Sequence, residues 1–255
     1  MIEIIERSDI REIRLARPPV NALNPSLVRQ LREAIEAARG DSVRGLLLSG
    51  TAGMFSAGLD VPFLLGIDRA AMERFWREFF GLCADLACSP VPVAAALTGH
   101  CPAGGTVLAI LCDFRIMARG EFRIGLNEVQ VGLSVPDCIQ AAMRRLVGVR
   151  RAEELMVAGT LIDAERAHAI GLVDELANVD QVVSCALRRL SDILKLPPNA
   201  MSETRRSARA DVAAVFADPS KLPVEKFLDG WFAAEAQATL NALVTKLKDR
   251  KPPAP

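Results

Sequence analysis

Residues 91–118 read VPVAAALTGHCPAGGTVLAILCDFRIMA, and this stretch decides the fold. It begins with a continuous apolar run, Val91–Leu97, which is typical of a strand buried on both faces. The glycine pair Gly104-Gly105 then opens an apolar helical segment, Thr106–Cys112, and the remainder returns as a second strand. Strand, helix and strand in succession predict an α/β architecture.

The same alternation continues on both sides of this stretch. Toward the N-terminus we predict strands at Ile2–Ile5, Glu12–Ala16 and Val43–Ser49, and helices at Asn24–Arg39 and Ala70–Cys88. After Gly171 the chain becomes mostly helical, with predicted segments at Val179–Leu194, Asn199–Ala217 and Val224–Lys248. We therefore expect one core unit over residues 1–195 and a helical extension of the same protein over residues 196–255.

Composition excludes several classes of protein. The 255 residues are 51% hydrophobic, which is enough for a large core without disulfide staples. The net charge is zero, so no overall positive field would attract nucleic acid or an anionic membrane surface. The N-terminal MIEIIERSDI resembles no targeting signal, and no apolar run approaches the ~18 residues of a membrane span. We expect a soluble cytoplasmic protein, or a mitochondrial matrix protein if a transit peptide has been removed.

The sequence contains no motif that is typical of a metal site or of a bound cofactor. The six cysteines form no CxxC pair, and the two histidines lack the neighbours of a metal site or a catalytic triad. No dinucleotide or P-loop signature is present. Cys101 beside His100 suggests a thiolate nucleophile as an alternative. Adjacent residues on an extended loop point in different directions, however, and this alternative is disfavoured.

Two glycine-bearing loops carry the chemistry. One is MFSAGLD at residues 54–60, and the other is GHCPAGG at residues 99–105. Small residues let a ligand approach the main chain, and N–H groups at a strand-to-helix turn have no intrahelical acceptor. The helix that starts near Gly104 adds the positive end of its dipole. Either loop alone is interpreted as a glycine-containing turn, but the pair predicts an oxyanion hole.

These motifs resemble those of a known family, the crotonase or enoyl-CoA hydratase/isomerase superfamily. Five segments match in the family's order: RPPVNALN at 17–24, MFSAGLD at 54–60, GHCPAGGTVLAILCDFRIMA at 99–118, IGLNEVQVGL at 124–133 and AERAHAIGLVDEL at 164–176. Within the family the form of CPAGG and GLNEVQVG is most similar to that of the mitochondrial-type 3,2-trans-enoyl-CoA isomerases.

The resemblance implies a fold and an assembly. It implies a crotonase-like spiral core of ββα repeats over residues 1–195. Residues 196–255 would form a C-terminal helical region that mediates trimerisation and covers the active site. The implied assembly is a homotrimer or a dimer of trimers. The implied substrate is an acyl-CoA thioester, so coenzyme A belongs to the substrate and no separate cofactor or metal is expected.

The resemblance also implies the residues of the site. The two oxyanion-hole amides fall on Ala57 and Gly104. Contacts with substrate or coenzyme A are expected from the residues around them, namely Ser56, Gly58, Asp60, Pro102, Ala103, Gly105 and Leu126. Asp60 also has a simpler structural interpretation as the cap of the following turn.

The carboxylates separate the family's two main reactions. Hydration in the family uses two glutamates; the position of the first carries Val107 here, and the second falls on Glu128. A single carboxylate over C2 and C4 suits a proton shift better than a hydration. We therefore predict an enoyl-CoA isomerase that moves a double bond from position 3 to position 2. The apolar neighbours of Glu128 should raise its pKa toward neutrality.

Two alternatives remain open at this stage. One is an enoyl-CoA hydratase or another crotonase-type lyase, in which Asp137 would enter the acyl pocket as a second acid/base. The other is a coenzyme A-binding scaffold without turnover. Asp113, in Cys-Asp-Phe-Arg, is interpreted as a structural residue at a strand start.

The C-terminal helical region contains candidate residues for binding the coenzyme A phosphates and the acyl chain. The coenzyme A phosphates require cations, and four lysines are candidates: Lys226, Lys246, Lys248 and Lys251. Four apolar residues recur at helical spacing and either roof the acyl tunnel or pack against the core: Phe227, Leu228, Trp231 and Phe232.

Overall fold

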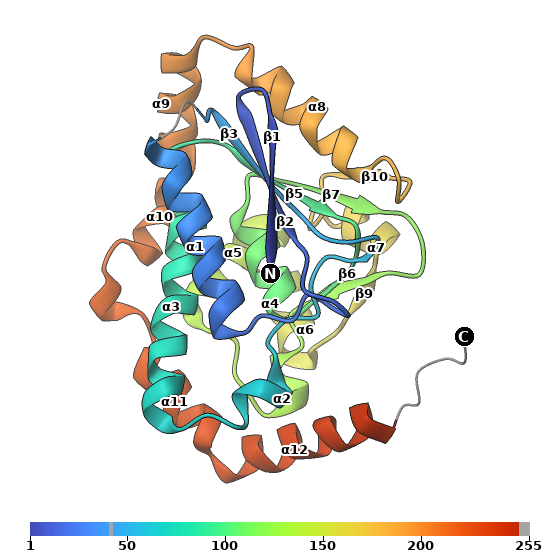
Figure 1. Ribbon diagram of the computed structural model, residues 1–255, viewed down its shortest axis with the longest axis vertical. Coiled ribbons are helices and arrows are strands. Elements are labelled where there is room, and N and C mark those ends of the chain that lie inside the picture. Colours follow the sequence, from blue (N-terminus) through green and yellow to red (C-terminus); the bar gives the residue numbers. More distant parts are fainter. Residues whose placement is uncertain (41–42, 250–255) are drawn as a thin grey trace.

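The computed structural model describes residues 1–40 and 43–249. Its centre is a six-stranded sheet with the order β1-β2-β3-β5-β7-β10 (Figure 1). The strands are β1 Ile2–Arg7, β2 Ile10–Leu15, β3 Gly45–Ser49, β5 Val93–Leu97, β7 Phe114–Ala118 and β10 Glu175–Ala177. The first two strands form an antiparallel hairpin, and all other neighbours are parallel. The α/β prediction is confirmed.

A second, four-stranded sheet lies beside the first, with the order β4-β6-β8-β9. Its strands are β4 Gly53–Met54, β6 Gly99–Pro102, β8 Arg123–Gly125 and β9 Ile162–Asp163. Each central strand of the large sheet is followed by a short strand of the small sheet and then by a helix. This ββα unit occurs three times, starting at β3, β5 and β7, so the predicted spiral core is confirmed. The short strands were not predicted, because segments of two to four residues carry no readable periodicity.

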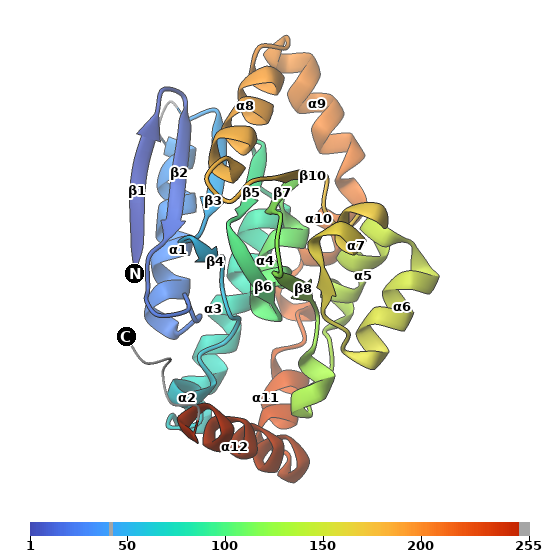
Figure 2. The same ribbon diagram turned by 90° about the vertical axis from the view of Figure 1, so that its right-hand side faces the viewer.

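Helices cover both faces of the large sheet (Figure 2). On one face lie α1 Pro25–Gly40, α3 Arg69–Ala87 and α4 Gly104–Leu111, and on the other lies α8 Val182–Leu194. Strand β5 shows the division: Ala94 and Ala96 belong to the apolar cluster of α8, whereas Val93, Ala95 and Leu97 belong to the larger core. All five residues are buried, as the continuous apolar run predicts.

Further helices follow the strands of the small sheet. They are α2 Val61–Leu64, the 3₁₀ turn η1 Glu128–Val131, α5 Asp137–Val147, α6 Val149–Ala158 and α7 Ala164–Ala169. The C-terminal part comprises α9 Pro198–Ala208, α10 Ala210–Phe216, the 3₁₀ turn η2 Pro219–Lys221, α11 Val224–Phe232 and α12 Ala234–Asp249. No helix in these described ranges is both long and apolar enough to cross a membrane.

The two long helices predicted in this region are each interrupted. The first breaks at Arg209, whose guanidinium donates to the Leu111 carbonyl at 2.7 Å. The second breaks at Ala233, which is extended (φ −62°, ψ 143°), so that α12 turns across the end of the molecule below α2 and α11 (Figures 1 and 2). Neither break falls at a proline or glycine. At Arg209 the contact with the core overrides helix propensity.

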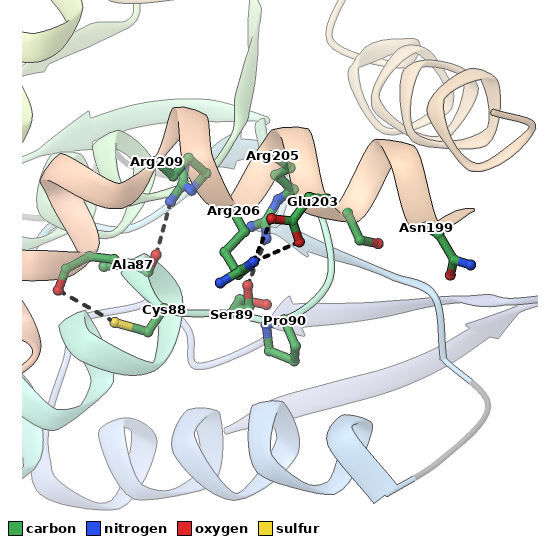
Figure 3. Close-up of a pocket in the computed structure, with 11 residues that line it drawn as sticks. Ala87, Cys88, Ser89, Pro90, Asn199, Glu203, Arg205, Arg206 and Arg209 are labelled. Carbon is green, nitrogen blue, oxygen red and sulfur yellow. Dashed lines mark hydrogen bonds and ion pairs between the residues drawn. The ribbon is translucent and has the colours of Figure 1, made fainter. Parts of the chain in front are cut away.

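The first break belongs to an anchor that ties α9 and α10 to the core. The carboxylate of Asp113 receives two hydrogen bonds from Arg205, at 2.9 and 2.8 Å, and one from the Val93 N–H at 2.7 Å. Figure 3 shows Arg205 reaching the Ser89 carbonyl in a hollow of about 490 Å³ between these helices and the end of α3. Asp113 is a structural residue, as predicted, and its arginine partners are held by the fold.

Candidate active site

The two glycine-bearing loops meet at one apolar cavity of about 770 Å³. Ala57, Leu59 and Asp60 line it from the first loop, and the second contributes Pro102, Ala103 and Gly104. Helices α3, α5, α11 and α12 and the turn η1 complete the wall. The cavity thus joins parts of the chain that are more than 200 residues apart.

The glycines bring the two loops into contact. Gly58 has φ +86°, and a Cβ there would lie 3.0 Å from the Gly104 nitrogen. A Cβ at Gly105 would lie only 2.6 Å from the Ser56 carbonyl oxygen. The Ser56 hydroxyl donates to the Asn21 carbonyl at 2.8 Å and accepts from the Gly58 N–H at 3.2 Å. These residues build the scaffold of the site.

Four of the residues predicted to contact substrate are absent from the cavity wall, and their contact with substrate stays a prediction. Ser56, Gly58, Gly105 and Leu126 do not line the cavity. Ser56 and Leu126 are buried among the supporting elements, and the two glycines act by allowing close approach of the main chain. Pro102, Ala103 and Asp60 do line the cavity.

The first predicted oxyanion donor also needs correction. The Ala57 N–H donates to the Val20 carbonyl at 2.9 Å, so it is not free and the prediction is wrong. Leu59 forms a parallel bridge with Leu23, and the bonds of that bridge use the Gly58 carbonyl and the Asp60 N–H. The Leu59 N–H therefore points away from Leu23. A Cβ built on Gly104 would lie 3.5 Å from this nitrogen.

The second predicted donor keeps its place. Gly104 is the first residue of α4, where N–H groups have no intrahelical acceptor. Its cap residue Ala103 has φ +47° and provides no side-chain hydrogen bond. In the part of the chain that the structure describes, neither the Gly104 nor the Leu59 N–H has an acceptor. Two free amides, one at the positive end of a helix, thus lie side by side at the cavity.

Glu128 lies on η1 and lines the same cavity. Its Oε2 is enclosed and has no hydrogen-bond partner among the described residues. Burial raises the pKa of Glu128 to about 7, and a hydrogen bond from its own backbone N–H acts in the opposite direction. A carboxyl group with this pKa takes up and releases a proton near neutral pH.

The other carboxylates are not available as a second acid/base. Asp60 lines the cavity, but it forms an ion pair with Arg17 at 2.6 Å and accepts from the Phe63 N–H at 3.2 Å. Its predicted role as a cap is confirmed. Asp137 stands outside the cavity with its side chain 83% exposed, and Lys226 lies 3.9 Å away. The expectation that Asp137 could enter the acyl pocket is wrong, because it begins α5 on the outer face. Val107 lines the cavity, as an apolar residue.

Aromatic side chains from two helices form the deep wall of the cavity. Trp76 of α3 makes edge contacts with Phe227 and Trp231 of α11, at ring-centroid distances of 5.3 and 6.2 Å. These three residues line the cavity, but Leu228 is buried in the core and Phe232 packs against Arg69. Of the four residues, Phe227 and Trp231 thus line the cavity and the other two do not.

Three of the four predicted phosphate-binding lysines are absent from the cavity wall. Lys246 and Lys248 are exposed on the last turn of α12, and Lys226 lies beside Asp137. Lys251 is outside the described residues. The cation that does line the cavity is Arg17. The sequence signal for it was its place in RPPVNALN, directly before the loop whose Val20 and Leu23 hold the first oxyanion loop.

The remaining alternative nucleophile is also absent from the site. Cys101 is buried, and burial raises the pKa of its thiol well above the usual range. His100 accepts a hydrogen bond from the Arg123 N–H at 3.2 Å through its Nδ1. Across residues 1–40 and 43–249, no group of three or more metal-ligating side chains gathers.

The ββα units and this cavity define an α/β protein of the crotonase class. The fold matches the crystal structure of human mitochondrial delta3-delta2-enoyl-CoA isomerase with a TM-score of 0.93 and 28% sequence identity, over 98% of this chain and 99% of that one. A family model described as enoyl-CoA hydratase/isomerase matches residues 6–249. The chain belongs to this family of acyl-CoA enzymes.

Curated relatives carry two different activities in their names. Human mitochondrial enoyl-CoA delta isomerase 1 is 30% identical over 254 residues, which are 98% of this chain and 84% of the human protein. A probable enoyl-CoA hydratase of Mycobacterium avium is 34% identical over 206 residues, 80% of this chain and 78% of that protein. Similarity alone therefore leaves the reaction open between isomerase and hydratase.

Proposed function

We propose that this protein is an enoyl-CoA isomerase that converts 3-enoyl-CoA thioesters into 2-enoyl-CoA thioesters. The observation that carries the proposal is the buried carboxyl of Glu128, whose Oε2 has no hydrogen-bond partner. Among the described residues that line the cavity, the one other carboxylate is Asp60, which is held by Arg17. Moving a double bond needs one group to take and return one proton. Adding water needs a group for the water and a group for C2, and Val107 cannot supply the second.

The proposed reaction passes through an enolate. The Glu128 carboxylate removes a proton from C2 of the substrate, and the electrons move onto the thioester oxygen to give a dienolate. The Gly104 and Leu59 amides donate hydrogen bonds to that oxygen. One such preorganised donor typically contributes about 3 kcal/mol to lowering the barrier. Protonated Glu128 then returns its proton to C4, which leaves the double bond between C2 and C3.

A panel of thioesters tests this proposal. A 3-enoyl-CoA should be converted into the conjugated 2-enoyl-CoA, seen as a rise in ultraviolet absorbance, while a crotonyl thioester in water should be consumed far more slowly. Glu128→Gln should lose nearly all of the activity while keeping the circular dichroism of the parent. Conversion of neither substrate would favour a scaffold without turnover, and retained activity in the Gln variant would exclude Glu128 as the proton carrier.

A hydratase is the second candidate, and its support is the similarity to proteins named as probable enoyl-CoA hydratases. It requires a water molecule activated by Glu128 alone, since Asp137 is outside the cavity. Preferred consumption of the 2-enoyl thioester in the same panel would establish this reaction in place of the isomerisation.

We also propose the assembly and compartment that the sequence suggests. A homotrimer or a dimer of trimers would give a sedimentation mass of three or six times 27.5 kDa. Residues 196–255 are proposed to mediate the assembly. The proposed compartment is the cytoplasm, which cell fractionation tests.

A further inference from the structure

Glu128 stands on a turn that is too short to hold its own position. η1 is one 3₁₀ turn closed by a bond from the Gly132 N–H to the Val129 carbonyl at 3.2 Å. The next bond runs from the Leu133 N–H to the Glu128 carbonyl at 3.1 Å. A single turn has little stability of its own, so its placement comes from the elements that pack against it.

Helix α6 supports one side of the turn. Its C-terminal Gly159 has φ +60°, and a Cβ there would lie 2.8 Å from Val129 Cγ2 and 3.0 Å from Gln130 Cγ. The Gln130 amide donates to the Gly159 carbonyl at 2.9 Å. The outer face of the turn is therefore in close contact with the end of α6.

Helix α12 supports the other side through its main chain. A Cβ at Gly132 would lie 2.9 Å from Ala236 Cα and 3.2 Å from the Ala236 nitrogen, and Ala236 is completely buried. The same helix lines the cavity with Leu240, Leu243 and Leu247. These four residues lie on one helical stripe, so one face of α12 both closes the cavity and presses on the turn that carries Glu128.

We infer that α12 positions the proton-carrying carboxylate, and that Gly132 and Ala236 are the positioning residues. The inference rests on the proposed isomerase function. Close contact between two backbones leaves no slack, so displacement of α12 shifts η1 by a similar amount. A displacement of about 1 Å at a catalytic group can cost ~10²-fold in rate. Docking of α12 thus links closure of the acyl cavity to a correctly placed base.

Charge contributes little to this arrangement. Every charged side chain on the two supporting helices is exposed. Those on α6 are Arg150, Arg151, Glu153 and Glu154, and those on α12 are Glu235, Lys246, Lys248 and Asp249. Within the cavity, Asp60 and Arg17 neutralise each other. Packing is therefore what holds Glu128 in its environment.

A matched pair of glycine substitutions tests the contact. Gly132→Ala adds a methyl group that meets α12, whereas Gly148→Ala adds the same group at φ +80° with nothing within 4 Å. Gly132 (φ +75°, ψ 15°) is in the left-handed helical region, whereas Gly148 (φ +80°, ψ 160°) is in a region that alanine adopts even less readily. The control therefore carries at least as much backbone strain and lacks only the contact with α12. We expect kcat to fall about 10- to 100-fold in Gly132→Ala and to stay within about twofold of the parent in Gly148→Ala.

A second pair covers the case in which Gly132→Ala does not fold. Ala236→Val thickens α12 at the buried contact, and Ala238→Val makes the same change at an exposed position of the same helix. The first should reproduce the loss of kcat, and the second should not.

The titration of Glu128 provides a readout that needs no turnover. The infrared carboxyl signal of each protein is recorded against its Glu128→Gln counterpart over a range of pH. The parent should titrate near pH 7, and Gly132→Ala and Ala236→Val should titrate at least one pH unit lower because the loosened turn admits water.

The outcomes distinguish the positioning role of α12 from the proposed isomerase function. Equal kcat and equal titration in each test variant and its control would overturn the positioning role. A parent protein that turns over no enoyl thioester would overturn the proposed function, and the infrared titration would still decide whether α12 positions Glu128.

Discussion

The environment of the Glu128 carboxyl group favours its protonated form. Its unpartnered Oε2 and the apolar cavity disfavour the ionised form, which raises the pKa to about 7. As a base, the group must be ionised when the substrate binds. We therefore predict that kcat/KM for a 3-enoyl thioester rises with pH through an apparent pKa near 7 and then levels off. A profile whose acidic limb lies near 4.5 would contradict this environment.

The same pKa predicts how stability depends on pH. The pKa of Glu128 in the folded state lies above its ordinary value of 4.5, so the folded state binds more protons than the unfolded state between pH 4.5 and pH 7. The contribution of Glu128 to the free energy of unfolding is fully present below pH 4.5 and is lost as the pH rises through 7. The loss approaches about 3 kcal/mol.

The substitution Glu128→Gln removes the carboxyl group and therefore this loss of stability at high pH. Urea unfolding at pH 4 and pH 8 should show the Gln variant gaining about 3 kcal/mol relative to the parent at the higher pH. An equal difference between the two proteins at both pH values would mean that Glu128 is solvated in the folded state.

At the scale of elements, the two loops differ in which amide is free. Replacing Leu59 by its α-hydroxy acid converts the N–H into an ester oxygen and removes one proposed oxyanion donor. We expect kcat to fall ~10²–10³-fold with little loss of stability, because this N–H has no acceptor in the described structure.

The matched control is the same replacement at Ala57. It removes the 2.9 Å bond to Val20 and should cost about 1 kcal/mol of stability while keeping kcat. Loss of kcat at Ala57 with none at Leu59 would return the oxyanion hole to the position predicted from the sequence.

At the scale of the whole molecule, the C-terminal helices depend on a buried ion pair. Arg205 and Asp113 have side chains that are 13% and 8% exposed. Arg205→Ala leaves the Asp113 carboxylate with the Arg209 guanidinium and the Val93 N–H, and we predict a loss of about 3 kcal/mol in the free energy of unfolding. Arg206→Ala, on the same helix but exposed, should leave stability unchanged. Equal stability of the two variants would show that the pair does not anchor α9.

The sequence alone determined the fold class and the two loops. A run such as Val91–Leu97 has to be buried on both faces, and the glycines at 104 and 105 mark a helix start wherever they fold. These are local properties, so they can be read without coordinates. The raised pKa of Glu128 followed in the same way, from the apolar residues around it in the chain.

Only the tertiary structure decided which groups face the cavity. The Leu59 N–H is free because Leu23 pairs with the residues on either side of it, and Asp137 is excluded because α5 begins on the outer face. Leu240, Leu243 and Leu247 line the cavity because α12 turns at Ala233. Each outcome depends on contacts between segments distant in sequence, and the direction of an amide or a side chain in space is set there.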